Sequence, residues 1–168
     1  MRKLLDCLYA GCGWLAGLAM IGVLVMVLLT IVSRLFGFAA PGTDAYAGYA
    51  MAAAGFLALA STLKKGEHIR VTLVLGMLKG RSQRALELAA LAVAVALSGF
   101  LAFYSVRLVS QSLELQDISV GIDATPLWIP QLGMALGAVV FFIAFLDEFI
   151  LELLGRRVPV NHEDAHHE

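Results

Sequence analysis

Four long stretches without any charged side chain or histidine constrain this chain more than any other feature of its sequence. They cover residues 13–33, 45–63, 88–106 and 124–146. Each is close to the ~20 residues that a helix needs to cross the hydrocarbon core of a bilayer. The 60% of apolar residues agrees with a membrane composition. We therefore predict an all-α integral membrane protein with four transmembrane helices, at 13–33, 45–63, 85–107 and 125–148.

The basic residues lie almost entirely on one side of these spans. If the chain begins inside, only Arg34 and Arg107 of the 12 Lys and Arg residues fall in outer segments. This bias predicts that both the N-terminus and the C-terminus of this multi-pass protein are cytoplasmic. The inner basic residues are divided among three short segments rather than forming one patch, so we expect no nucleic-acid binding.

The first span could also be interpreted as a secretory signal peptide. Arg2 and Lys3 precede it as a basic n-region would, and Phe38-Ala39 could serve as a weak cleavage site. However, its apolar run is longer than the ~7–15 residues usual for such a peptide. We therefore predict that it is retained as a membrane span.

The chain is predicted to form a single four-helix membrane domain, residues 1–155, followed by a polar cytoplasmic tail, residues 156–168. Between the second and third spans, residues 67–79 show a partial apolar alternation that could indicate a strand. An isolated strand would leave its backbone unpaired near lipid. A short interfacial helix, with Ile69, Leu73 and Met77 toward the acyl chains, is therefore the preferred prediction.

Small residues dominate the second span, which has few strong drivers of insertion. By the insertion scale, its Phe and Leu residues contribute only about −1 to −2.5 kcal/mol. Because small side chains let helix backbones approach closely, we expect this span to pack against other helices. Ala53, Ala54 and Gly55 are candidate contact residues in it.

Three further sets of small residues recur at helical spacing. Gly13 and Gly17 form one GxxxG pair, and Gly133 and Gly137 form another. The third span carries a stripe made of Ala85, Ala89, Ala92, Ala96 and Gly99. Packing within the bundle is the favoured interpretation of these sets, and dimerisation is the alternative.

The spans lack the residues that ion coupling or haem binding within a membrane would use. They hold no ionisable residue at mid-depth, no proline at a span centre and no histidine for haem. Three carboxylates follow the fourth span at its inner edge, where we expect them to be solvated: Asp147, Glu148 and Glu152. The histidines of the tail have no scaffold to hold a metal ion. We expect no catalytic residue, no cofactor and no metal site, and so a subunit rather than an enzyme.

The segment Gly66-Glu67-His68-Ile69-Arg70-Val71, directly after the Ala-rich second span, resembles the small membrane subunit of tripartite ATP-independent periplasmic (TRAP) transporters. Arg34 closing the first span, Asp44 opening the second, and Ile129-Pro130 before the Gly133 and Gly137 pair support the resemblance. It extends in topology and spacing from Leu4 to Leu154. Thr72 departs from the family, which often has an acidic residue after the motif.

The resemblance implies three components. A soluble periplasmic binding protein captures an organic acid such as a dicarboxylate or sialic acid, and a large membrane subunit moves it inward with sodium. The small subunit is implied to be a fixed partner of the large one and to help dock the binding protein. Membrane lipid is the remaining partner, with the headgroups meeting the basic cluster Lys79, Arg81 and Arg84.

The same resemblance implies roles for particular residues. Gly66, His68 and Val71 match the motif and would shape the inner turn. Arg34 and Asp44 share the outer face, where they would pair with each other or contact the large subunit or the binding protein. Three outer carboxylates are either a further docking surface or solvated loop charges: Glu114, Asp117 and Asp123.

Two other functions remain open at this point. One is a small self-assembling exporter, which would need an essential ionisable residue inside a span. The other is a membrane assembly factor without a role in transport, which solute uptake in a deletion strain would distinguish.

Overall fold

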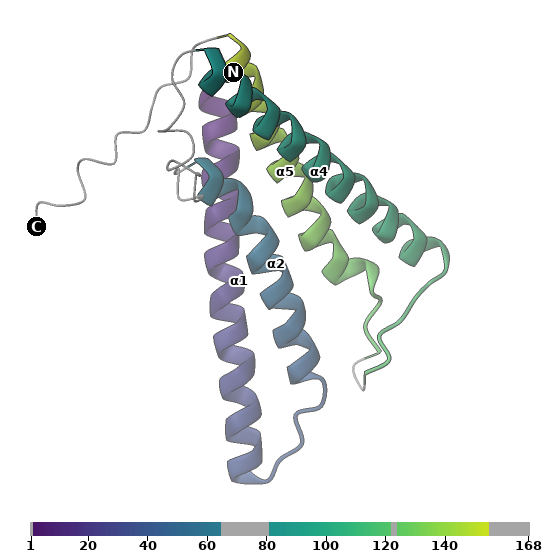
Figure 1. Cartoon of the computed structure of the whole chain (residues 1–168). Helices are drawn as coiled ribbons and strands as arrows, with labels where there is room; N and C mark the ends of the chain where they lie inside the picture. Colours follow the sequence, from purple (N-terminus) through teal and green to yellow (C-terminus); the bar gives the residue numbers. More distant parts are fainter. Residues whose placement is uncertain (1, 65–80, 122–123, 155–168) are drawn as a thin grey trace, which may run out of the picture.

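The computed structural model describes residues 2–64, 81–121 and 124–154 of the 168-residue chain. Within these residues the architecture is all-helical: α1 (Arg2–Phe36), α2 (Thr43–Lys64), α4 (Arg81–Glu114) and α5 (Trp128–Leu153) (Figure 1). All four helices are long and apolar enough to cross a membrane. The predicted fold class is therefore confirmed. The predicted interfacial helix at 67–79 and the polar tail at 156–168 lie outside the described residues.

α1, α2 and α4 extend beyond both ends of the charge-free stretches from which they were predicted, whereas α5 begins at Trp128, inside its stretch, and extends beyond it only at the C-terminal end. α1 starts at Arg2 and α4 runs for 34 residues to Glu114. A helix satisfies its own backbone hydrogen bonds, so it has no reason to stop where the hydrocarbon stops. Charged residues mark the edge of the lipid. The helix boundaries are marked instead by turn-forming residues: Gly37, with φ of 70°, follows the end of α1, and Gly42, with φ of 84°, precedes the start of α2.

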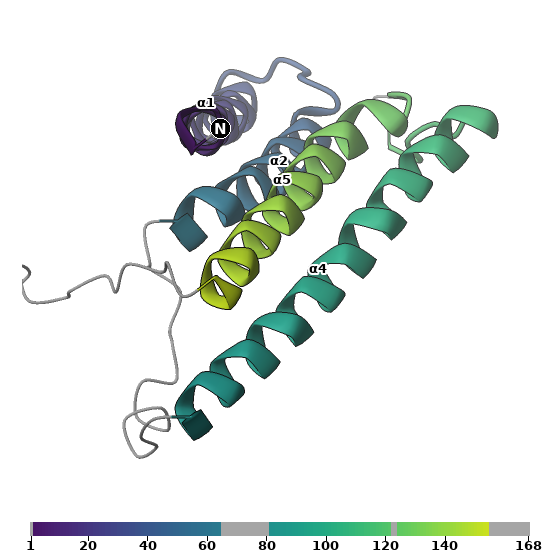
Figure 2. The same ribbon diagram turned by 90° about the horizontal axis from the view of Figure 1, so that it is seen from above.

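The four helices form an open row rather than a closed bundle. Extensive contacts join α1 to α2, α2 to α5, and α5 to α4. Viewed from above, α1 and α4 accordingly lie on opposite sides of the central pair α2 and α5 (Figure 2). The hairpins α1–α2 and α4–α5 lie close together at the end where the chain begins and diverge toward the other end (Figure 1).

The contact between α2 and α5 depends on the absence of side chains at two glycines. A Cβ at Gly133 would lie 2.9 Å from the Cβ of Ala53, and one at Gly137 would lie 2.6 Å from the carbonyl oxygen of Phe56. The backbones of the two helices therefore meet almost directly. The prediction that the second span packs against other helices is confirmed, and this GxxxG pair serves packing within the chain.

The GxxxG pair of α1 is used only in part. A Cβ at Gly13 would be 3.4 Å from the side chain of Ser61 on α2, an ordinary contact, whereas one at Gly17 would meet nothing within 4 Å. The glycines of this pair are therefore not essential to packing in the way that Gly137 is in α5.

The predicted small-residue stripe of α4 faces mostly away from the rest of the chain. Its four alanines are exposed, and only Gly99 touches α5, where a Cβ would be 3.2 Å from the Phe142 ring. A different small-residue row of α4 is buried: Ser98, Ala102, Ser105 and Ser112. Both rows follow the same helical spacing, so periodicity alone could not select the row that packs.

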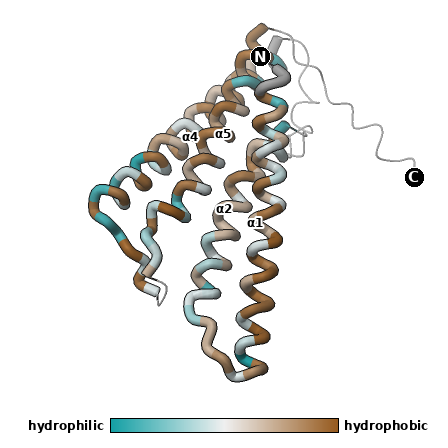
Figure 3. Tube along the Cα trace, turned by 180° about the vertical axis from the view of Figure 1, so that it is seen from behind, coloured by the Kyte–Doolittle hydropathy of each residue, from teal (hydrophilic) through white to brown (hydrophobic). Residues whose placement is uncertain are grey.

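Large apolar side chains cover the outer surfaces of the row. α1 exposes many of them, among them Leu18, Leu24 and Leu35. In Figure 3, α1 is strongly hydrophobic along most of its length, whereas the half of α2 nearer its N-terminal end is paler. This distribution suits flanking helices in contact with lipid and a central helix packed between two neighbours.

We expect Gly137→Ala to destabilise the fold by about 1–3 kcal/mol, because the added methyl group would overlap the α2 backbone. Gly17→Ala is the matched control. It should be neutral or stabilising by up to about 1 kcal/mol, since its Cβ meets open space and alanine favours the helix. Reversible unfolding in detergent micelles would measure both free energies, and equal effects of the two substitutions would contradict the assigned contact.

Candidate functional site

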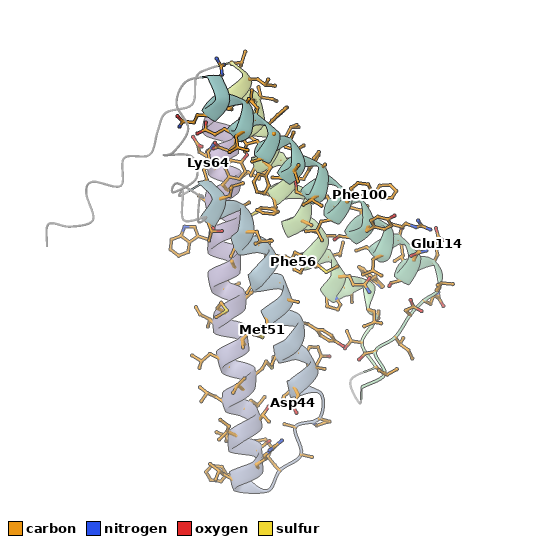
Figure 4. All side chains as sticks on the ribbon, viewed as in Figure 1. Asp44, Met51, Phe56, Lys64, Phe100 and Glu114 are labelled. Atoms are coloured by element: carbon orange, nitrogen blue, oxygen red, sulfur yellow. The ribbon has the colours of Figure 1, made fainter. Side chains whose placement is uncertain are left out.

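Charged and aromatic side chains from three helices meet at the end of the row where the chain begins. The Nζ of Lys64, in the last turn of α2, is 2.9 Å from Oδ2 of Asp147 and 3.7 Å from Oε1 of Glu148, both on α5. The same Nζ lies 5.4 Å from the ring centroid of Tyr9 on α1. Tyr9 is buried, and Lys64 and Asp147 are half-buried. We call these four residues the Lys64 cluster (Lys64 is labelled in Figure 4).

The position of Lys64 and Asp147 in the sequence explains why they meet. Each is the first charged residue on the same side of a charge-free stretch, Lys64 after 45–63 and Asp147 after 124–146. Spans that cross the same hydrocarbon thickness place such residues at the same depth. A lysine in the last turn of α2 is also stabilised by the helix dipole. The expectation that Asp147 and Glu148 are simply solvated was therefore wrong.

Arg84 makes a second connection at this end, between α4 and α5. Its Nη2 donates to the carbonyl oxygens of Glu152, at 3.4 Å, and Leu153, at 3.3 Å. Carbonyls in the last turn of a helix lack partners within the helix, and a cation there also favours the helix dipole. Glu152 itself is buried, which again differs from the solvated position expected for it.

A cluster of hydroxyl groups joins α1 to α2 at the opposite end. The Oγ1 of Thr30 lies 2.8 Å from Oγ1 of Thr43 and 3.4 Å from Oδ1 of Asp44, which is in the first turn of α2. Arg34 is exposed nearby in the last turn of α1. Among the described residues Arg34 and Asp44 form no ion pair, so their predicted pairing with each other is not observed.

Two tyrosines of α2 hold the connection between α4 and α5 against the first hairpin. The hydroxyl of Tyr49 donates to Oγ of Ser119 at 2.8 Å, and that of Tyr46 lies 3.0 Å from Oγ1 of Thr125. The two rings pack edge to face at 6.0 Å. These contacts span the region where the two hairpins diverge, and we call them the tyrosine brace.

The connection that the brace holds is itself ordered by backbone hydrogen bonds. Ser119 N donates to Thr125 O at 2.8 Å and Leu127 N donates to Asp117 O at 2.9 Å, around an antiparallel bridge between Ile118 and Pro126. Sequence reasoning missed the brace. The available signal was two aromatic residues with polar ends, early in a span and facing a polar loop.

The other predicted site residues are divided among several environments. Glu114 is exposed at the end of α4 (Figure 4), and Asp117 is half-buried in the connection. Ala53 packs on Gly133 and Ala54 is buried, whereas Gly55 is exposed with open space around it. The structure does not bring these residues together into one site. Four others lie outside the described residues: Gly66, His68, Val71 and Asp123.

The polar contacts of the described residues join helices to one another. No group of three or more His, Cys, Asp or Glu side chains in this part of the chain is placed to hold a metal ion. Its ion pairs lie at one end of the row, and hydrogen bonds between the hairpins lie at the other. These contacts define a four-helix membrane protein whose hairpins are tied at both ends.

A family model described as "Tripartite ATP-independent periplasmic transporters, DctQ component" matches residues 23–155, which is more than half of the chain. The chain therefore belongs to this family, the small membrane component of TRAP transporters, as its resemblance indicated. A search of curated proteins finds no match. The family is a transporter component rather than an enzyme, and in TRAP systems it works with a large membrane subunit and a periplasmic binding protein.

We expect Lys64 and Asp147 to be energetically coupled by about 1 kcal/mol, the upper range for pairs that keep some exposure to solvent. A double-mutant cycle with Lys64→Gln and Asp147→Asn, read as unfolding free energies in detergent micelles, would measure this coupling. Lys64→Gln with Glu87→Gln is the matched control, because Glu87 is within hydrogen-bond distance of Gln83 instead. Equal coupling in the two cycles would contradict a specific ion pair.

Proposed function

We propose that this chain is the accessory and scaffold subunit of a sodium-coupled, binding-protein-dependent importer of an organic acid, such as a dicarboxylate or sialic acid. It would reside in the bacterial inner membrane with both termini in the cytoplasm. Family membership over residues 23–155 is the observation that carries this proposal. The distribution of Lys and Arg supports the orientation.

The charge-free stretches support a scaffold role over a conducting one. Transporters that couple to sodium or protons usually place ionisable groups or broken helices near the middle of the membrane. The four stretches of this chain carry no ionisable Asp, Glu, Lys, Arg or His. Ion coupling and solute binding would therefore belong to the large subunit, and this chain would hold that subunit in position.

The open row leaves faces on which a large membrane subunit can pack. On α2, exposed small residues lie on the side that neither α1 nor α5 covers: Gly48, Ala52 and Gly55. The alanine stripe of α4 offers a second such face. Small residues let the backbone of a partner helix approach closely. Gly55 remains a candidate for contact with the large subunit. Ala53 and Ala54 pack within this chain instead, Ala53 against Gly133 and Ala54 in the buried core.

We assign docking of the periplasmic binding protein to the end of the row away from the Lys64 cluster, where the tyrosine brace holds the connection between α4 and α5. Glu114 and Asp117 belong to this region, and Arg34 and Asp44 are exposed at the neighbouring hairpin. The described part of this connection, residues 115–121 and 124–127, is held by hydrogen bonds and would lose little conformational entropy on docking. We include Asp123 in this surface from its place in the sequence.

We expect Gly55→Trp to reduce co-purification of the large subunit, because the bulky ring would keep a partner helix from the α2 backbone. Leu24→Trp is the matched control, since Leu24 is already large and exposed on α1. Affinity capture of tagged chain from membranes, with the large subunit quantified by immunoblot, would measure the effect. Unchanged capture by Gly55→Trp would place the partner elsewhere.

The function itself is tested by uptake. Deleting this chain should abolish sodium-dependent uptake of the solute, and restoring it should recover uptake, while the purified chain alone in liposomes should transport nothing. Normal uptake in the deletion strain would favour an assembly factor unrelated to transport. Gradient-driven accumulation by the chain alone would favour the self-assembling exporter.

A further inference from the structure

A groove of about 410 Å³ runs along α4, with one wall from α5. Its apolar lining includes Leu101 and Leu108 of α4 and Met134 of α5, and its polar lining includes Tyr104, Arg107 and Gln111. We call it the Arg107 groove. Among the described helices, α4 packs extensively only on α5, so no other described helix packs extensively over the outer side of this groove.

The depth of Arg107 in the membrane follows from the sequence. It is the first charged residue after the charge-free stretch 88–106, whose 19 residues span ~28 Å at ~1.5 Å per residue. This length nearly equals the ~30 Å hydrocarbon thickness of a bilayer. Its guanidinium therefore lies where the hydrocarbon ends and the glycerol and phosphate groups begin, on the side of the α4–α5 connection.

Arg107 lacks an anionic partner within the described chain. Its side chain is exposed, and none of the described carboxylates lies within ion-pair distance. An arginine at this boundary is costly unless it reaches water or an anion. Its planar donors match a phosphate group in a bidentate manner.

The cation and the amide of the groove, Arg107 and Gln111, lie toward its headgroup end, with Leu108 between them. Leu101 lies nearly two turns toward the membrane centre from Arg107, and Gln111 lies one turn toward the headgroups. Tyr104 is an amphipathic side chain of the kind that favours the interface. Apolar side chains that line a groove beside a cation and an amide match the two parts of a phospholipid, its acyl chains and its phosphate group.

We propose that the Arg107 groove binds one phospholipid of this leaflet. The Arg107 guanidinium holds the phosphate group together with the Gln111 amide, and one acyl chain lies along Leu101, Leu108 and Met134. The proposal needs only that the chain is inserted in a membrane, so it stands or fails independently of the proposed transport function.

Binding of lipid to the full-length purified chain tests this proposal. The chain in detergent micelles is titrated with phosphatidylglycerol, phosphatidylethanolamine or diacylglycerol, and bound lipid is counted by native mass spectrometry. One molecule of either phospholipid should bind, and diacylglycerol, which lacks the phosphate, should bind much more weakly. Arg107→Gln should weaken phospholipid binding about tenfold, as expected for loss of a charge-assisted hydrogen bond.

Arg34→Gln is the matched control, because Arg34 is an exposed arginine near the same end of the row but lines no part of this groove. It should bind phospholipid as the unmodified chain does. Leu108→Trp, which fills the groove while keeping Arg107, should also weaken binding. If circular dichroism shows that Arg107→Gln does not fold, Leu108→Trp tests the proposal in its place, and unchanged phospholipid binding by Leu108→Trp would contradict it.

Three outcomes would overturn the proposal. Arg107→Gln could bind phospholipid as tightly as the unmodified chain, or Arg107→Gln and Arg34→Gln could weaken binding equally. Alternatively, diacylglycerol could bind as well as the phospholipids, which would show that the phosphate is not recognised.

Discussion

The direct approach of the α2 and α5 backbones is the interaction on which the rest of this structure depends. Gly137 lies against the backbone of Phe56, and Gly133 lies against Ala53. In a membrane, helices gain little from burying apolar surface, because lipid tails are equally apolar. Close van der Waals packing then carries the association, and it requires glycine where the backbones meet. This contact is the main one that joins the two hairpins through the membrane.

Polar contacts at the two ends of the row join the same two hairpins and supplement this central packing. The Lys64 cluster joins both hairpins at one end, and the tyrosine brace joins them at the other. Because these groups lie near the headgroups, their desolvation costs less than it would at mid-depth. The result is a row of helices tied at its centre and at both ends. Such a row is suited to supporting a partner that moves, which is the role proposed within a TRAP transporter.

The row architecture also explains why many large apolar side chains are exposed. In a closed bundle each helix would have two neighbours, whereas here α1 and α4 each pack extensively on only one. The exposed sides of these helices carry both small-residue stripes and large apolar side chains. Small residues suit a partner helix and large ones suit lipid. The Arg107 groove lies on such an unpartnered side, which is why a lipid molecule can reach it.

Charge placement and length along the chain were enough to predict four membrane helices, whereas the family was indicated by the resemblance of the segment 66–71 and its context. The cost of placing a charge in hydrocarbon is a property of each residue, so it can be read without knowing any contact. The weak second span likewise predicted a helix that packs against other helices. The sequence could not show which of two equivalent small-residue rows of α4 packs, because both satisfy the same spacing. It also missed the pairing of Lys64 with Asp147, although their equal depth was available as a signal.

What the sequence by itself determined is therefore where the chain crosses the membrane. Only the tertiary structure decided which helices are neighbours, which glycines matter and which polar groups meet across the two hairpins. The physical reason is that insertion is governed by the transfer free energy of individual residues. Packing is governed instead by the fit between residues that are far apart in the chain, such as Tyr49 and Ser119.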